Sequence, residues 1–202
     1  MPATLPDVVL WIVAAAIVTQ RLAELRLARR NEAWARARGA VEHGARHYPA
    51  FVVLHAAWLA GWIGEAWVRG PYLVRGWPMW LTLLGLAEMI RYWAIASLGR
   101  RWNTRVLVLP GEPPVTRGPY RFLRHPNYVA VVLELAAVPL MFGAWITAVA
   151  ASVANAILLA GVRIPVEQRA LDAAASRPGI PPGGLTPQRP IGAEDHEQRR
   201  KQ

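Results

Sequence analysis

Four long apolar segments limit what this chain can fold into. They cover residues 5–27, 49–68, 77–98 and 127–162. A helix needs about 20 mostly apolar residues to cross a bilayer, so the fourth segment is too long for one crossing. Pro139 and Gly143 lie in its middle, where proline removes a backbone donor and glycine loosens the chain. We therefore predict an all-α polytopic membrane protein with about five transmembrane helices, the last two forming a helical hairpin.

The composition agrees with a membrane protein and argues against other classes. Of the 202 residues, 54% are hydrophobic and ten are Trp, whereas a soluble domain of this length would alternate apolar with polar residues more often. The absence of cysteine excludes disulfides, thiolate catalysis and Cys-based metal sites, and we expect no bound metal. The formal charge is +10, but the cationic residues flank the apolar segments and do not form a stripe with interleaved aromatic residues. We therefore expect no nucleic-acid partner.

Arginine placement predicts the orientation of the segments. The loop after the first segment carries Arg29, Arg30, Arg36, Arg38 and Arg46, the next loop only Arg69 and Arg75, and the loop after the third Arg100, Arg101, Arg105, Arg117, Arg121 and Arg124. Positively charged loops stay in the cytoplasm. We therefore predict that the N-terminus lies outside, that the C-terminus and the open end of the hairpin lie inside, and that the first segment is a retained anchor.

The C-terminal part of the chain changes in composition. From about residue 173 it reads "SRPGIPPGGLTPQRP" and then becomes highly charged. Such a segment buries too little apolar surface to fold. We expect a transmembrane domain at 1–172 and a disordered cytoplasmic tail at 173–202.

Several ionisable residues lie within the apolar segments, where charge is costly. Arg21 and Glu24 are three residues apart, as are Glu88 and Arg91, so each pair can form a local ion pair on one helix face. For His55, a hydrogen-bonded interior histidine is the favoured interpretation over a catalytic one.

Glu134 differs because no cation lies three or four residues from it. It requires a partner on another helix, a bound ligand or a proton. A buried, unpaired carboxyl group can act as a general base, and a hydrogen bond to a neighbouring helix would satisfy it equally well. We carry Glu134 as a candidate catalytic residue.

Two polar clusters flank the predicted hairpin. The first is "GPYRFLRHPNY", in which Pro126 suits the first turn of a helix whose free N–H groups attract a carboxylate or phosphate. The second is "VRIPVEQRAL", which places Arg163 and Glu167 on one helix face if the helix continues through Pro165. Because a hairpin brings both ends to the same membrane face, we expect a small-molecule site there.

Together these two clusters resemble the isoprenylcysteine carboxyl methyltransferase superfamily of integral membrane methyltransferases, over about residues 100–171. The resemblance implies that S-adenosylmethionine is bound by the hairpin and its preceding loop, and that Arg163 is catalytic and orients the acceptor oxygen. The residues implied to contact the cofactor are Val115, Tyr120, His125, Asn127, Tyr128 and Glu167. Where the family usually has two acidic residues, this chain has Glu167 and Gln168.

The N-terminal stretch "RLAELRLARRNEAWARARGAVEHGARHYPAFVVLH" resembles a bacterial subgroup associated with O-methylation of long-chain alkylpyrones and alkylresorcinols made by type III polyketide synthases. The later stretch "HPNYVAVVLELAAVPL", which contains Glu134, fits the same subgroup. This resemblance implies an O-methyltransferase of the bacterial inner membrane that acts on a lipophilic acceptor and is linked to such a synthase. A carboxylate acceptor would need only orientation by Arg163, whereas a phenol or enol would need a base, which Glu134 or Glu24 could supply.

Other interpretations remain open at this point. Sterol-type reductases share a similar hairpin but bind a nicotinamide cofactor, and a phospholipid N-methyltransferase would act on an amine. A non-catalytic scaffold would use the basic loops to bind anionic lipids. The loop 101–105 is either a lid over the cofactor or an interfacial anchor with Trp102 at headgroup depth.

Overall fold

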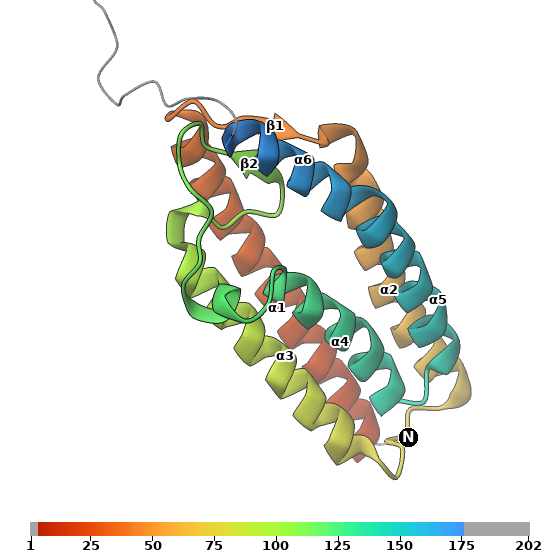
Figure 1. Ribbon diagram of the computed structural model, residues 1–202. Helices are drawn as coiled ribbons and strands as arrows, with labels where there is room; N and C mark the ends of the chain where they lie inside the picture. Colours follow the sequence, from red (N-terminus) through yellow and green to blue (C-terminus); the bar gives the residue numbers. More distant parts are fainter. Residues whose placement is uncertain (1–3, 176–202) are drawn as a thin grey trace, which may run out of the picture.

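The computed structural model describes residues 4–175, which form a helical bundle closed at one end by a short strand pair (Figure 1). The main helices are α1 (Leu5–Arg36), α2 (Tyr48–Arg69), α3 (Trp77–Leu98), α4 (Pro126–Met141), α5 (Trp145–Leu158) and α6 (Ile164–Ala175). The shorter elements are β1 (Val41–His43), η1 (Ala45–His47), η2 (Gly99–Arg101), β2 (Val106–Val108), η3 (Gly118–Arg121) and the π turn η4 (Leu159–Arg163).

Four helical stretches are long and apolar enough to cross a membrane: Leu5–Arg36, Ala45–Arg69, Trp77–Arg101 and Trp145–Ala174. The remaining apolar helix, α4, has only 16 residues. Large apolar side chains such as Trp11, Val53 and Met89 are exposed on the outside of the bundle, which suits lipid as the surrounding solvent. The predicted all-α membrane fold is confirmed, with the difference that its fifth apolar helix is shorter than a full crossing.

The first helix continues beyond its apolar segment. We expected it to end near residue 27, but α1 extends to Arg36. The added residues include alanine, arginine and glutamate, which favour helix without being apolar. The last nine residues of α1 therefore carry the helix into the layer that contains β1 and β2.

The hairpin turns at residues 142–144, between α4 and α5. Gly143 has a φ of +69°, and a Cβ there would lie 2.1 Å from the hydroxyl oxygen of Tyr72, so only glycine fits. Pro139, which we expected to break the segment, instead lies inside the last turn of α4. The turn itself is held by α2, because Arg69 donates to the Gly143 carbonyl at 3.1 Å.

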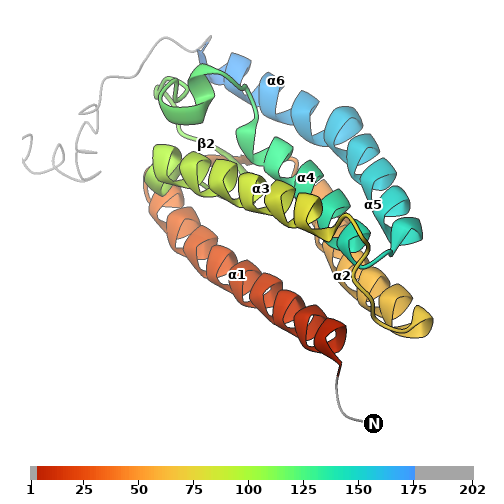
Figure 2. The ribbon, with the colours of Figure 1, turned by 90° about the horizontal axis from the view of Figure 1, so that it is seen from below.

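Side-chain packing joins α2 to the hairpin of α4 and α5 near this turn. Figure 2 shows α3 lying between α1 and α4 in that view, and α5 running along the opposite side of α4. Trp62 of α2 stacks on Phe142 with ring centroids 5.4 Å apart, and Trp58 donates from Nε1 to the Leu135 carbonyl of α4 at 3.1 Å. These contacts fix α2 against the hairpin in the interior of the bundle.

A small layer covers the other end of the bundle. The strands β1 and β2 pair antiparallel, with Glu42 opposite Leu107. Helix α6 packs on them through Ala170, which shares an apolar cluster with Val106 and Val108. Helix α6 continues to Ala175, three residues beyond the predicted domain boundary at 172, and the rest of the predicted tail, 176–202, lies outside the described residues.

A buried ion cluster connects α1, α3 and α4. The expected local pairs are confirmed, with Arg21 Nη1 at 2.6 Å from Glu24 and Arg91 Nε at 3.5 Å from Glu88. Both arginines also bind Oε2 of Glu134, and Arg91 Nη1 lies 3.6 Å from Glu24 Oε1. Of the three alternatives for Glu134, the structure therefore shows a partner on another helix, and there are two such partners, one on α1 and one on α3.

This cluster accounts for the burial of two charged residues in an apolar bundle. Arg91 and Glu134 are each only 1% exposed. An isolated charge in such a place is strongly unfavourable, but paired charges that are hydrogen-bonded are tolerated. Loss of Glu134 would remove the buried oxygen that both arginines contact, so Glu134 has a large effect on how α4 packs against α3 and is joined to α1.

We predict that Glu134→Gln destabilises the protein far more than Glu88→Gln. The Glu134 carboxylate accepts a hydrogen bond from Arg21 and another from Arg91, and loss of its charge weakens both, at roughly 1.5–3 kcal/mol per bond. The Glu88 side chain is 22% exposed, makes one 3.5 Å contact with Arg91 and accepts a hydrogen bond from Gln20. A glutamine at this position can still accept that hydrogen bond, so loss of the charge should cost about 1 kcal/mol or less. Thermal unfolding of both variants in the same detergent measures the difference, and equal small shifts would contradict this role for Glu134.

Candidate functional site

The two polar clusters meet at the hydroxyl group of Tyr128. This tyrosine lies in the first turn of α4, and its hydroxyl donates a hydrogen bond to the Glu167 carboxylate of α6. The same oxygen accepts a hydrogen bond from Arg163 Nε at 3.0 Å. The hairpin thus brings residues 35 and 39 positions apart in sequence into direct contact.

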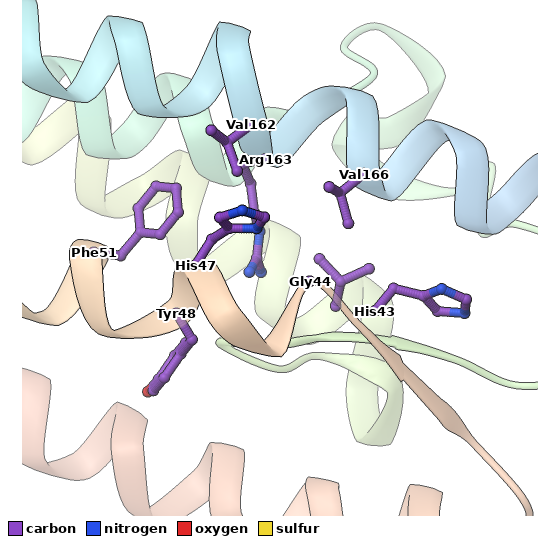
Figure 3. A pocket seen from close by; sticks show the side chains of 9 residues that line it. His43, Gly44, His47, Tyr48, Phe51, Val162, Arg163 and Val166 are labelled. Carbon is purple, nitrogen blue, oxygen red and sulfur yellow. The ribbon is translucent and has the colours of Figure 1, made fainter.

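Arg163 is fixed by two further groups around its guanidinium. Its Nη2 donates to the Thr104 carbonyl at 2.9 Å, and its Cζ lies 5.8 Å from the centre of the Phe51 ring. Figure 3 shows Arg163 pointing from the π turn toward the start of α2, with Phe51 and His47 beside it in a small pocket. A guanidinium held in this way is pre-oriented, so little side-chain entropy is lost when it binds a further group.

The backbone around Arg163 explains its direction. The π turn η4 ends at Arg163, two residues before Pro165, and α6 continues the helix through that proline. Because proline has no N–H to donate to the preceding turn, a regular α-helix would lose a hydrogen bond here. A π turn is a recognised way for a helix to adjust its register at such a point, and π turns are common at functional sites.

His125 and Asn127 lie at the start of α4. The His125 ring stacks on Tyr128 with centroids 5.2 Å apart, and its Nδ1 lies 3.6 Å from Glu167 Oε1. The Oδ1 atom of Asn127 is buried and has no hydrogen-bond partner among residues 4–175. A buried acceptor without a partner requires an explanation, and a ligand that donates a hydrogen bond would provide one.

Tyr120 approaches the same site from η3. Burial raises the pKa of the Tyr120 hydroxyl well above its ordinary value, and the negative charge of Glu167 raises it further. Tyr120 therefore stays protonated at physiological pH and can donate a hydrogen bond. Val115 lies half-buried in the loop before η3.

A cavity of about 420 Å³ adjoins His125 and Tyr128. Its wall is formed largely by apolar side chains of α4 and of the segment from η4 to α6, including Val129, Val132 and Leu159. Arg124, His125 and Tyr128 supply its polar groups. Its size and lining suit a small molecule with one long apolar part and one polar end.

These residues fit S-adenosylmethionine, the cofactor that the sequence resemblance implies. The unpartnered Asn127 oxygen and the Glu167 carboxylate are acceptors suited to an ammonium or hydroxyl group. The start of α4 has no side-chain cap, so the Asn127 N–H, which follows Pro126, is suited to a carboxylate. Hydrogen-bond acceptors and donors therefore lie close together at the start of α4, as a cofactor with both an ammonium and a carboxylate group requires.

Glu134 is not part of this group. It lies six residues beyond Tyr128 on α4, roughly 9 Å further along the helix axis, within the ion cluster. Of the candidate residues from the sequence, the structure brings together His125, Tyr128, Arg163 and Glu167, with Tyr120 and Asn127 next to them.

Thr104, Tyr48 and Phe51 are site residues that sequence reasoning missed. Thr104 lies in the loop 101–105 for which two roles remained open; its Oγ1 lies 3.3 Å from the Tyr48 hydroxyl. Trp102 in this loop is only 3% exposed, so it is not an anchor at headgroup depth. The loop instead lies against Arg163, which agrees with the alternative of a cover over the site.

Comparison with known proteins places both polar clusters within one family match. The model of the Isoprenylcysteine carboxyl methyltransferase (ICMT) family matches residues 80–173, which contain both clusters. A protein of Bacillus subtilis, "Uncharacterized protein YpbQ", is 38% identical over 161 residues, which cover 80% of this chain and 95% of that protein. An "Uncharacterized protein" of Haemophilus influenzae is 28% identical over 162 residues, 79% of this chain and 93% of the relative. No solved structure matches the chain significantly.

The matched region begins in α3 and ends in α6, so it includes Tyr128, Arg163 and Glu167. The match to the Bacillus subtilis protein extends over nearly its whole length. The chain belongs to the isoprenylcysteine carboxyl methyltransferase family, which indicates a membrane methyltransferase.

Proposed function

We propose that this protein is an S-adenosylmethionine-dependent O-methyltransferase that acts on a lipophilic acceptor within the membrane. One observation carries the proposal: in a chain of this family, the Tyr128 hydroxyl is hydrogen-bonded to both Arg163 and Glu167 beside a cavity of about 420 Å³ that is mostly apolar. A polar, pre-oriented site beside an apolar cavity suits a reaction between a water-soluble cofactor and a lipid.

The cofactor-binding residues are those at the start of α4 and on α6. Asn127 Oδ1 and Glu167 supply acceptors, Tyr120 supplies a donor, and the His125 ring lies over Tyr128. Val115, in the loop that precedes η3, lines the cofactor. When bound, S-adenosylmethionine supplies an electrophilic methyl group for transfer to an acceptor oxygen.

Arg163 orients the acceptor. Its Nε and one Nη are held by Tyr128 and Thr104, which fixes the plane of the guanidinium. An acceptor oxygen that binds the remaining N–H groups would be held in one position, and its negative charge would be stabilised there. A lysine could not reproduce this set of contacts because it lacks the planar fork.

The acceptor class follows from the cavity and the sequence resemblance. A long alkyl chain suits the apolar wall formed by Val129, Val132 and Leu159. A long-chain alkylpyrone or alkylresorcinol, or a lipid carboxylate, has such a chain and an acceptor oxygen at its polar end. The subgroup resemblance favours the first two, and with them a functional link to a type III polyketide synthase.

The location of the protein is part of the proposal. We propose the cytoplasmic membrane of a bacterium, with the N-terminus outside and the site at the cytoplasmic face. The arginine-rich loops support this orientation because they lie at the same end of the bundle as α6, opposite the N-terminus (Figure 1). A cofactor from the cytoplasm then reaches the site directly.

The contacts of Glu134 bear on its expected role as a base. Its Oε2 is bound by two guanidinium groups, which stabilise the ionised carboxylate. A catalytic role for Glu134 remains a prediction from the sequence, and its contacts favour charge balance within the bundle over proton transfer.

We predict that the detergent-purified protein binds S-adenosylmethionine and that Glu167→Gln weakens this binding roughly 10- to 100-fold, as expected for loss of a hydrogen bond to a charged group. Isothermal calorimetry measures both, with Glu112→Gln as a control because Glu112 is an exposed glutamate outside the site. NADPH should neither bind nor compete. Saturable NADPH binding without S-adenosylmethionine binding would instead support a reductase.

We also predict that Arg163→Lys lowers the methylation rate of an alkylresorcinol roughly 100- to 1,000-fold, because the lysine cannot orient the acceptor oxygen. Radiolabelled methyl transfer in liposomes measures the rate. Arg169→Lys is the matched control, since Arg169 is an exposed arginine of α6 that donates to the Pro165 carbonyl. Full activity of Arg163→Lys on every acceptor would remove Arg163 from the reaction.

A further inference from the structure

His55 of α2 has an arrangement that the proposed reaction has not used. Its Nδ1 lies 2.8 Å from the Phe51 carbonyl oxygen, one turn earlier on the same helix. A carbonyl oxygen can only accept a hydrogen bond, so Nδ1 carries the proton. In the neutral ring the lone pair is then on Nε2, which is the form of histidine that can accept a proton.

The Nε2 atom is available for an external group. Within residues 4–175 it has no hydrogen-bond partner, and it is not among the fully buried polar atoms. His55 itself is half-buried. The hydrogen bond to Phe51 therefore fixes the tautomer, while the basic nitrogen remains accessible.

His55 lies on the membrane side of the candidate site. Phe51 faces the Arg163 guanidinium at 5.8 Å, and His55 is four residues further along α2, roughly 6 Å deeper in the bundle. Residues four apart on a helix share a face, so both side chains lie on the same side of α2. A lipid whose oxygen binds Arg163 beside Phe51 would therefore have its polar end about one helical turn from His55.

The charges of the ion cluster act on His55 in opposite senses. Glu134 favours a protonated ring, whereas Arg21 and Arg91 oppose it. The Glu134 carboxylate is therefore the group of this cluster that would stabilise an imidazolium, and the two arginines favour release of the proton afterwards.

The cluster contains polar atoms that its own members leave without a hydrogen bond. Among the described residues, Oε1 of Glu134 and of Glu88 are buried and lack a hydrogen-bond partner, as do Nε of Arg21 and of Arg91. Oε1 of Glu134 is therefore an acceptor within the cluster that could bind a further donor.

We propose that His55 is the general base for hydroxyl acceptors, an inference that rests on the proposed methyltransferase function. As the acceptor oxygen forms its bond to the methyl carbon, its O–H proton passes to Nε2 of His55. The electron pair of the broken carbon–sulfur bond remains on sulfur. The proton later leaves His55 for water, and the neutral ring is restored.

This role determines which acceptors depend on His55. A phenol or enol with a pKa near 10 is mostly protonated at neutral pH and needs a base, whereas a carboxylate is already ionised. His55 therefore matters for alkylresorcinol or alkylpyrone acceptors, and it contributes nothing to methylation of a lipid carboxylate.

The test compares wild type with His55→Asn, in which the amide nitrogen can still donate to the Phe51 carbonyl but no basic nitrogen remains. We expect methylation of an alkylresorcinol at pH 7 to fall about 100- to 10,000-fold. Calorimetry should show unchanged binding of S-adenosylmethionine, which also establishes that the variant is folded. Thr82→Val is the control, because Thr82 makes the same kind of bond, at 2.8 Å to the Pro78 carbonyl four residues earlier.

Two further readouts separate a base from a structural residue. Added imidazole should restore part of the activity of His55→Ala, because it supplies the missing base. The wild-type rate should rise with pH and level off once His55 is neutral, with Arg21, Arg91 and Glu134 as the charged groups that face it. In His55→Asn the rate should instead rise about tenfold per pH unit up to the pKa of the phenol.

The outcomes distinguish this inference from the function on which it rests. Unchanged rate and pH profile in His55→Asn would overturn the role of His55 and leave the methyltransferase intact. A wild-type rate that rises without levelling off up to the pKa of the phenol would do the same without any variant. Absence of S-adenosylmethionine binding by the folded wild type would overturn both.

Discussion

The carboxylate of Glu134 is bound by Arg21 from α1 and by Arg91 from α3, and the packing of these three helices depends on this contact. Charges are expensive in an apolar bundle, so each member of the cluster is acceptable only while the others are in place. The cluster therefore fixes the position of α4 relative to α1 and α3. Because α4 begins with His125, Asn127 and Tyr128, the same contact determines where the site residues of this helix lie.

The site is built where two independent constraints meet. The hairpin turn at Gly143 sets the distance between α4 and α5, and the π turn before Pro165 sets the direction of Arg163. Tyr128 then bonds to both Arg163 and Glu167, so the first turn of α4 and the start of α6 are joined through one hydroxyl group. The Thr104 carbonyl adds a third segment, which closes the site from the side of the strand pair.

Much of this arrangement could be predicted from the sequence, because it depends on local patterns. Apolar length located the helices, and the spacing of Arg21 with Glu24 and of Glu88 with Arg91 predicted the local ion pairs that the structure contains. The i, i+4 spacing of Arg163 and Glu167 placed them on one face, and hairpin closure placed them near His125 and Tyr128. The helical extension of α1 to Arg36 was missed, because hydropathy reports the membrane-crossing part of a helix and not its full length.

The sequence by itself determined the class of fold, the crossing segments and the family of the site, since helix length, apolar content and short motifs are properties of contiguous residues. Only the tertiary structure decided which distant groups meet. Glu134 is 113 residues from Arg21 and 43 from Arg91, and no periodicity on one helix indicates such partners. The same holds for the contact of Arg163 with a backbone carbonyl at Thr104 and for the position of His55 beside the ion cluster. These contacts depend on how whole helices pack, because burial makes an unpaired charge unfavourable and so selects the arrangement in which opposite charges from different helices lie together.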